Sequence, residues 1–134
     1  MGEPHESRAK PRCTFPAGHR PLVKFKILPS KEDRRYDAAL LDLSETGARL
    51  LGELPGDQIF ALGNGQAKLG CNIYLADKLL KTLAIARWFN NGVGGDFEFG
   101  VQFLPNPQLS ADIKRFLIRH QIDTRRFSRQ RLQS

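Results

Sequence analysis

Apolar and polar residues alternate with a period of two along much of this chain, and this alternation predicts β-strands. Residues 77–89 are ambiguous, because their apolar positions also fit one face of a helix. Their neighbours are strands, so we predict a turn and then a strand from about Leu80 to Phe89. The remaining predicted strands lie at 22–28, 36–43, 48–51, 59–62, 69–75 and 97–103.

Turn residues separate these strands at regular spacing, which is typical of an all-β barrel or sandwich of six or seven strands. A helix is predicted after Pro105 and Pro107, with Ser110 as its N-cap and its end near Gln121. We expect it to pack on the barrel through an apolar stripe formed by Ile113, Phe116 and Leu117.

The chain has 134 residues, a length that suits one domain. We divide it into three parts. Residues 1–21, which hold four prolines and lack apolar periodicity, are predicted to be an irregular, flexible basic arm. Residues 22–107 are the predicted barrel, and residues 108–134 the C-terminal helix with a basic tail that we expect to be disordered or ligand-dependent.

The net charge of +7 is concentrated at the two ends of the chain. Residues 1–35 hold nine basic and four acidic residues, and residues 108–134 hold seven and two, whereas the middle is acidic. Basic ends suggest an anionic partner such as a nucleotide, a nucleic acid or an acidic protein surface. Solvated tails without a partner are the simpler reading of either end taken alone.

Several classes of protein are disfavoured by the sequence. No apolar run is long enough to span a membrane, and the polar start lacks the apolar segment of a signal peptide, so we expect a cytoplasmic protein. Cys13 and Cys71 are too far apart for a metal site by spacing, and the three histidines form no ligand pattern. Without a nucleophile–base arrangement or a Gly-rich phosphate loop, we expect no enzyme and no cofactor.

The strands predicted at 36–43 and 48–51 are joined by an Asp-x-Ser-x-x-Gly sequence, formed by Asp42, Ser44 and Gly47. Asp and Ser bend a chain by accepting hydrogen bonds from nearby backbone N–H groups, and Gly adopts backbone angles that other residues avoid. A purely structural turn is therefore the simplest reading of this motif alone. The alternative is that Asp42 and Ser44 also face a ligand.

An Arg-x-x-x-Arg pair, Arg8 and Arg12, lies on the arm before the first strand. In this order and strand context, the pair and the Asp-x-Ser-x-x-Gly turn resemble the signature of the PilZ domain, a bacterial receptor for the second messenger cyclic di-GMP. The resemblance covers about residues 8–120. It implies a PilZ-like β-barrel of six to seven strands with a C-terminal α-helix packed against it.

The resemblance also implies a site. Arg8 and Arg12 would hold phosphate or guanine, because a guanidinium can bond either one or stack on the base. Asp42 would accept the N–H edge of guanine, Ser44 would bond a phosphate or hold the loop, and Gly47 would permit close approach. Two further residues are weaker candidates: Lys10 would add long-range attraction, and Trp88 would lie near the bound base or simply belong to the core.

The predicted function is thus a cyclic di-GMP receptor that signals to a downstream protein by ordering its arm onto the barrel. A degenerate PilZ domain that acts only through protein–protein contacts is one alternative. A small nucleic-acid-binding barrel is another. It is disfavoured because the phenylalanines of 97–103 are expected in the core rather than interleaved with basic residues on an exposed face.

Overall fold

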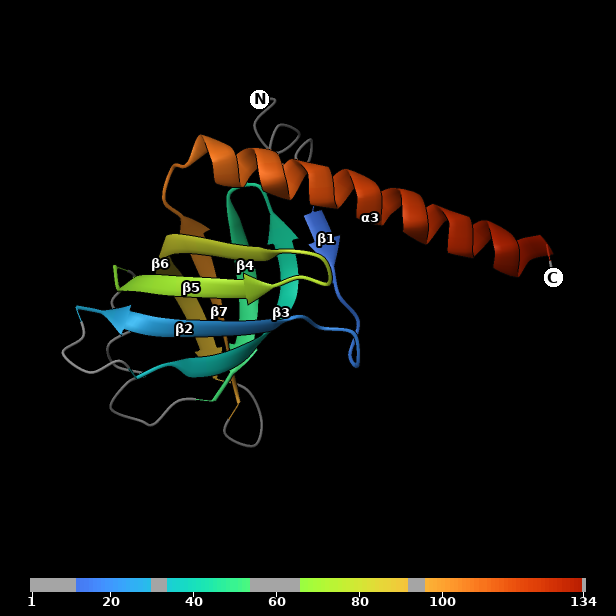
Figure 1. Ribbon diagram of the computed structural model, residues 1–134. Coiled ribbons are helices and arrows are strands. Elements are labelled where there is room, and N and C mark those ends of the chain that lie inside the picture. The colour runs from blue at the N-terminus through green and yellow to red at the C-terminus, as the bar shows by residue number, and fades with distance from the viewer. Residues whose placement is uncertain (1–11, 30–33, 54–65, 92–95, 134) are drawn as a thin grey trace, which may run out of the picture.

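The computed structural model describes residues 12–29, 34–53, 66–91 and 96–133, with side chains in the C-terminal helix as far as His120. Seven strands and one long helix form the described chain (Figure 1). The elements are β1 (Arg12–Thr14), β2 (Leu22–Leu28), β3 (Tyr36–Ser44), β4 (Gly47–Gly52), β5 (Lys68–Tyr74), β6 (Leu79–Asn91), β7 (Phe97–Phe103) and α3 (Pro107–Gln133).

Six of the strands close into a barrel. Neighbouring strands follow the order β3-β2-β5-β6-β7-β4, and β4 pairs with β3 again to close the ring. Every described pairing is antiparallel. The predicted all-β barrel with a C-terminal helix is therefore confirmed, and the ambiguous segment after residue 77 contributes the strand β6.

β1 lies outside the ring and pairs only with β3. β1 and β2 pair with the same edge of β3. β2 pairs with residues 36–39 of β3, and β1 pairs with residues 42–44. The prediction of irregular structure is wrong for Arg12–Thr14. The physical reason is that the open edge of β3 presents backbone groups that need partners, and that Cys13 and Phe15 are apolar and become buried there. The division into arm, barrel and tail stays a prediction.

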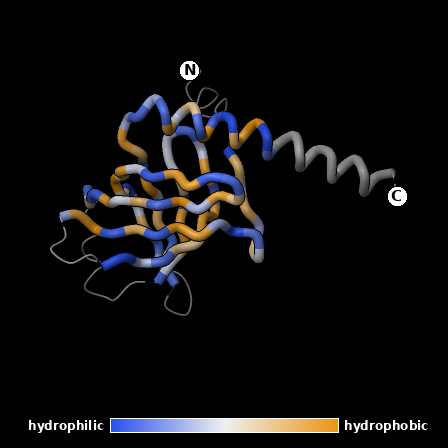
Figure 2. Tube along the Cα trace, viewed as in Figure 1, coloured by the Kyte–Doolittle hydropathy of each residue, from blue (hydrophilic) through white to orange (hydrophobic). Residues whose placement is uncertain are grey.

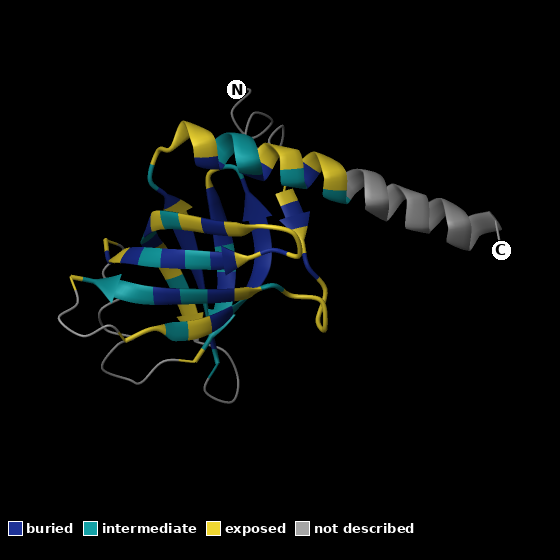
Figure 3. Cartoon of the chain, in the orientation of Figure 1, coloured by how far each residue is buried: buried dark blue, intermediate teal, exposed yellow. Residues whose placement is uncertain are grey.

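Buried and exposed residues alternate along the barrel strands (Figures 2 and 3), and the buried, inward-facing ones form the core. Phe25, Phe97 and Phe99 are almost fully buried. Phe99 stacks on Phe97 of the same strand with ring centroids 5.2 Å apart, and its ring lies tilted against Phe25 of β2 at 5.3 Å. Leu109, Ile113 and Leu117 of α3 join this core from one end of the barrel. The helix lies across that end beside β1, and its C-terminal part extends past the barrel (Figure 1).

The start and end of α3 differ from the prediction. Asn106, not Ser110, is the N-cap, since its Oδ1 accepts hydrogen bonds from the backbone N–H groups of Gln108 and Leu109 at 3.1 Å. Pro107 then occupies the first helical position, where its missing N–H costs nothing. The helix runs to Gln133 instead of ending near Gln121, because residues 108–133 contain no glycine or proline to stop it.

The short strand predicted at 59–62 and the first eleven residues of the predicted arm lie outside the described residues. Among the described residues, no helix is both long and apolar enough to cross a membrane.

The cap of α3 is testable. Asn106→Ala should lower the free energy of unfolding by about 1 kcal/mol, because two backbone donors lose their acceptor. Asn106→Asp is the matched control and should keep most of the stability. Urea unfolding measures both variants, and an Asn106→Ala protein as stable as wild type would contradict the cap.

Candidate functional site

Four strands bring their outward-facing residues into one row on the barrel wall. Asp42 of β3 is paired with Arg49 of β4, Arg49 with Gly100 of β7, and Gly100 with Trp88 of β6. The neighbouring inward-facing positions belong to the core, so this row faces away from it. On the other side of β3, β1 pairs Thr14 with Asp42 and Arg12 with Ser44, two residues further along β3.

The Asp42 carboxylate is the electrostatic centre of the row. Its side chain is only 3% exposed, and Arg49 Nε donates to its Oδ2 at 2.6 Å. Arg12, whose side chain is 55% exposed, contacts both carboxylate oxygens at 3.4–3.5 Å. The bond to Asp42 raises the pKa of Arg49 above its ordinary value. A buried carboxylate needs such partners, because an unpaired charge inside a protein is costly.

The turn after Asp42 is held together by hydrogen bonds of the Ser44 hydroxyl group. Ser44 Oγ accepts from the Thr46 N–H at 3.4 Å and donates to the Gly47 carbonyl at 3.3 Å. A Cβ on Gly47 would collide with the backbone carbonyl of Val101 in β7, so only glycine allows β4 to approach β7 so closely here. The turn therefore has a structural reason for both Ser44 and Gly47, whatever else they do.

Trp88 covers the other end of the row. Its indole lies directly over Gly100, where a Cβ would collide with the ring. The register between β6 and β7 shifts between Ala86 and Trp88, and this bulge carries Arg87, whose Nε donates to Gln102 Oε1 at 2.9 Å. Bulges re-aim side chains next to sites. Trp88 is 41% exposed, so its ring is a partly open apolar surface and not a core residue.

A hollow of about 250 Å³ lies between these groups. Its lining combines three guanidinium groups, the serine–glycine turn and the indole. Such a lining suits an anionic, planar ligand, because guanidinium groups bond phosphates and an indole stacks on aromatic rings. The volume is below the 300–1,000 Å³ or so of a pocket that encloses a ligand, so a nucleotide would be covered only in part.

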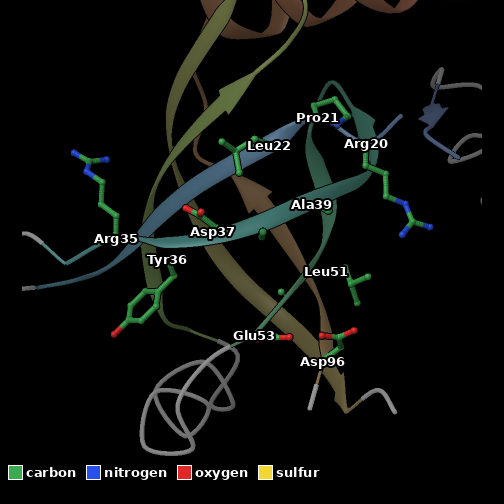
Figure 4. Close-up of a pocket in the computed structure, with 12 residues that line it drawn as sticks. Arg20, Pro21, Leu22, Arg35, Tyr36, Asp37, Ala39, Leu51, Glu53 and Asp96 are labelled. Atoms are coloured by element: carbon green, nitrogen blue, oxygen red, sulfur yellow. The ribbon is translucent and has the colours of Figure 1, made fainter. Parts of the chain in front are cut away.

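A larger hollow of about 730 Å³ lies elsewhere, beside β2, β3 and β4 (Figure 4). Three carboxylates, Asp37, Glu53 and Asp96, line it along with Arg20 and Arg35. Glu53 directly follows Gly52, and Asp96 directly precedes Phe97, the partner of Gly52, so two of these carboxylates lie beside the paired ends of β4 and β7. These carboxylates would repel an anionic ligand, so the larger hollow suits an anion less well than the hollow beside Trp88.

Comparison with known protein families matches residues 7–119 to the PilZ domain. The chain belongs to the PilZ family. A comparison with curated protein sequences gives no match.

Several solved structures resemble this chain over most of its length. The PilZ domain of YcgR from Escherichia coli, solved with c-di-GMP, superposes with a TM-score of 0.69 at 13% identity, covering 90% of this chain and 96% of that one. The MrkH–c-di-GMP complex of K. pneumonia gives 0.71 at 17% identity, covering 89% of this chain and 53% of that one. The Bacillus subtilis inhibitor of motility, MotI/DgrA, gives 0.66 at 13% identity, covering 88% and 53%. This PilZ chain thus spans nearly all of the first and about half of the other two.

The structure places five of the seven residues predicted from the sequence around one hollow or its edge: Arg12, Asp42, Ser44, Gly47 and Trp88. Arg8 and Lys10 lie outside the described residues. Their roles in binding, like those of the other five, stay predictions.

Sequence reasoning missed the other residues that line the hollow, among them Arg49, Arg87, Gly100 and Gln102. The period-two alternation placed Arg49 two residues after Gly47 and so on the same face, which was the available signal. The bulge that exposes Arg87 left no signal in the pattern.

The Asp-x-Ser-x-x-Gly turn and the segment after β1 both touch α3. Glu45, inside the Asp-x-Ser-x-x-Gly turn, accepts a hydrogen bond from Ser110 Oγ at 2.8 Å and lies 3.6 Å from Lys114 Nζ. Phe15, which directly follows β1, packs against Phe116 and His120 with centroids 6.2 and 5.6 Å away. The helix therefore rests on the strand that carries Arg12 and on the turn that carries Ser44.

The described residues hold no group of His, Cys, Asp or Glu side chains that could bind a metal ion. Cys13 lies next to the site on β1, but its thiol faces the core, and burial together with the nearby Asp42 charge raises its pKa to about 11. It would thus be mainly a thiol, and a poor nucleophile, near neutral pH.

The Trp88–Gly100 contact can be tested by fluorescence, because Trp88 is the only tryptophan of the chain. Gly100→Ala should displace the indole, shift its emission to longer wavelength and increase its quenching by iodide. Gly70→Ala on β5 is the matched control, since a Cβ there meets only ordinary contacts, the nearest being Lys26 Cγ at 3.7 Å. Identical emission from both variants would contradict the close packing of Trp88 on Gly100.

Proposed function

We propose that this PilZ domain is a non-enzymatic receptor for cyclic di-GMP. The observation that carries the proposal is the hollow in which Arg12, Arg49 and Arg87 converge beside the exposed ring of Trp88. Cyclic di-GMP offers two phosphates and two guanines, and this lining has a partner for each kind of group. The solved complexes of YcgR and MrkH with c-di-GMP have the same fold, which supports the choice of ligand.

In this proposal each residue acts through an ordinary contact. Arg12 bonds a phosphate or the O6/N7 edge of guanine, together with Arg8 from the preceding part of the arm. Asp42 accepts the N1–H and N2–H₂ edge of a guanine, Ser44 donates to a phosphate, and Trp88 stacks on a base. Gly47 keeps the floor of the site free of a side chain.

The arm supplies the signal. β1 pairs with β3 over only three residues, so few backbone hydrogen bonds hold it in place. A ligand that bonds Arg12 and the β3–β4 turn at once favours the docked position of β1 by its differential affinity for that position. Because Phe15 follows β1 and packs on α3, we propose that docking is communicated to the helix and read there by a downstream protein in the cytoplasm.

Binding is tested by calorimetric titration with cyclic di-GMP. Arg12→Ala should weaken binding by about 2 kcal/mol, as expected for loss of a charge-assisted contact. Arg115→Ala is the matched control, because this arginine is also exposed but lies on α3, where it pairs with Asp112 and does not line the hollow. If the Arg12→Ala protein bound the ligand as tightly as wild type, the assignment of Arg12 would be wrong. If titration of cyclic di-GMP into the wild-type protein gave no binding heat, the chain would not be a cyclic di-GMP receptor.

The docking of the arm is tested by hydrogen exchange. Amides from Arg12 to His19 should exchange faster without cyclic di-GMP than with it, while β5 and β7 stay protected in both conditions. An arm that is equally protected without ligand would show that the signal takes another route.

A further inference from the structure

We infer that Arg49 is a positioning residue of this site: it holds the Asp42 carboxylate in place, so that Arg12 is free to leave Asp42 and engage the ligand. The inference rests on the proposed binding of cyclic di-GMP and adds a residue outside both sequence motifs.

The two arginines contact Asp42 unequally. Arg49 Nε lies 2.6 Å from Oδ2, within the range of a strong charge-assisted hydrogen bond. Arg12 lies 3.4 and 3.5 Å from the two oxygens, at the outer limit of a hydrogen bond. Arg12 is also the more exposed of the two, at 55% against 36%. The contact with Arg12 is therefore the weaker one and the easier one to exchange.

The two arginines are also anchored differently. Arg49 belongs to β4, directly opposite Asp42 in the barrel, and its other end reaches Glu98 of β7 at 3.6 Å. Two carboxylates on neighbouring strands thus fix the orientation of its guanidinium group. Arg12 belongs to β1, which is held to the barrel by three residue pairs of β3. When the arm rearranges, Arg49 stays with Asp42.

This arrangement solves an electrostatic problem for the site. Removing the only partner of a buried charge is strongly destabilising, whereas Asp42 keeps a close partner when Arg12 departs. Departure of Arg12 also uncovers Oδ1, the oxygen that Arg49 does not bond and that a guanine N–H would need. Without Arg49, the buried carboxylate would retain Arg12 and compete with the ligand for it.

A double-mutant cycle tests the inference, with cyclic di-GMP titrated calorimetrically into each protein. Arg49→Met removes the donors but keeps the apolar stem, and we expect it to weaken binding about tenfold or more. Asp42→Asn should also weaken binding. The double variant should bind within about twofold of Asp42→Asn, because Arg49 acts only through the charge of Asp42. It replaces both charges by neutral groups and so also guards against misfolding of the single variant.

Arg87→Met is the matched control, since Arg87 lines the same hollow but bonds Gln102 instead of Asp42. In the double variant, the fold-loss of affinity caused by Arg87→Met should multiply with the fold-loss caused by Asp42→Asn, because the two residues act independently. If the effects of Arg49→Met and Asp42→Asn also multiplied, Arg49 would contact the ligand independently and the positioning role would be wrong. Wild-type affinity in Arg49→Met would overturn it as well.

A measurement without ligand separates this inference from the proposed function. In Arg49→Met the Nη–H protons of Arg12 should exchange with water more slowly than in wild type, because Arg12 contacts Asp42 through Nη1 and Asp42 then has no other partner among its described contacts. NMR of the arginine side chains detects this. In Arg87→Met the exchange should stay unchanged. An unaltered Arg12 signal in Arg49→Met overturns the inference even if cyclic di-GMP binds, whereas failure of wild type to bind overturns the proposed function.

Discussion

The nine residues of β3 bond to three other strands, and this sharing decides where the site forms. One edge of β3 closes the barrel with β4. The other edge is divided between β2 and β1, because β2 reaches only the first half of the strand. The second half must find another partner for its backbone groups, and the segment carrying Arg12 supplies it. The need to complete a sheet edge thus brings the arm to Asp42 and Ser44.

Burial of Asp42 is the second constraint. A carboxylate only 3% exposed on the barrel wall would destabilise the fold unless cations covered it. Arg49 of the barrel strand β4 pairs with this carboxylate, and Arg12 of β1, the strand outside the ring, adds a second cation. The same charge that the fold must neutralise therefore gathers two guanidinium groups at one place, and the more exposed of them, Arg12, is the one that an anionic ligand would use.

The sequence predicted the barrel and its strands well, because period-two alternation directly reflects which residues face the core. It also predicted that Asp42, Ser44 and Gly47 would share a turn. It failed at Arg12–Thr14, where prolines on either side suggested irregular structure and the pairing with β3 depends on a partner thirty residues away. Local pattern carries no information on such a pairing. It failed likewise at Arg87 and at the close packing of Trp88 on Gly100, because a bulge and an indole position depend on the neighbouring strand.

The position of α3 limits how the site can change. Its buried residues join the barrel core, so the start of the helix cannot move freely. Yet Phe15 packs on Phe116 and His120, and Glu45 bonds Ser110, so the helix touches both β1 and the β3–β4 turn. A displacement of β1 along β3 must repack the Phe15 ring, because packed side chains rearrange between discrete positions and do not deform continuously. Any change in how the arm docks is therefore felt first around residues 116–120, just before the helix leaves the barrel.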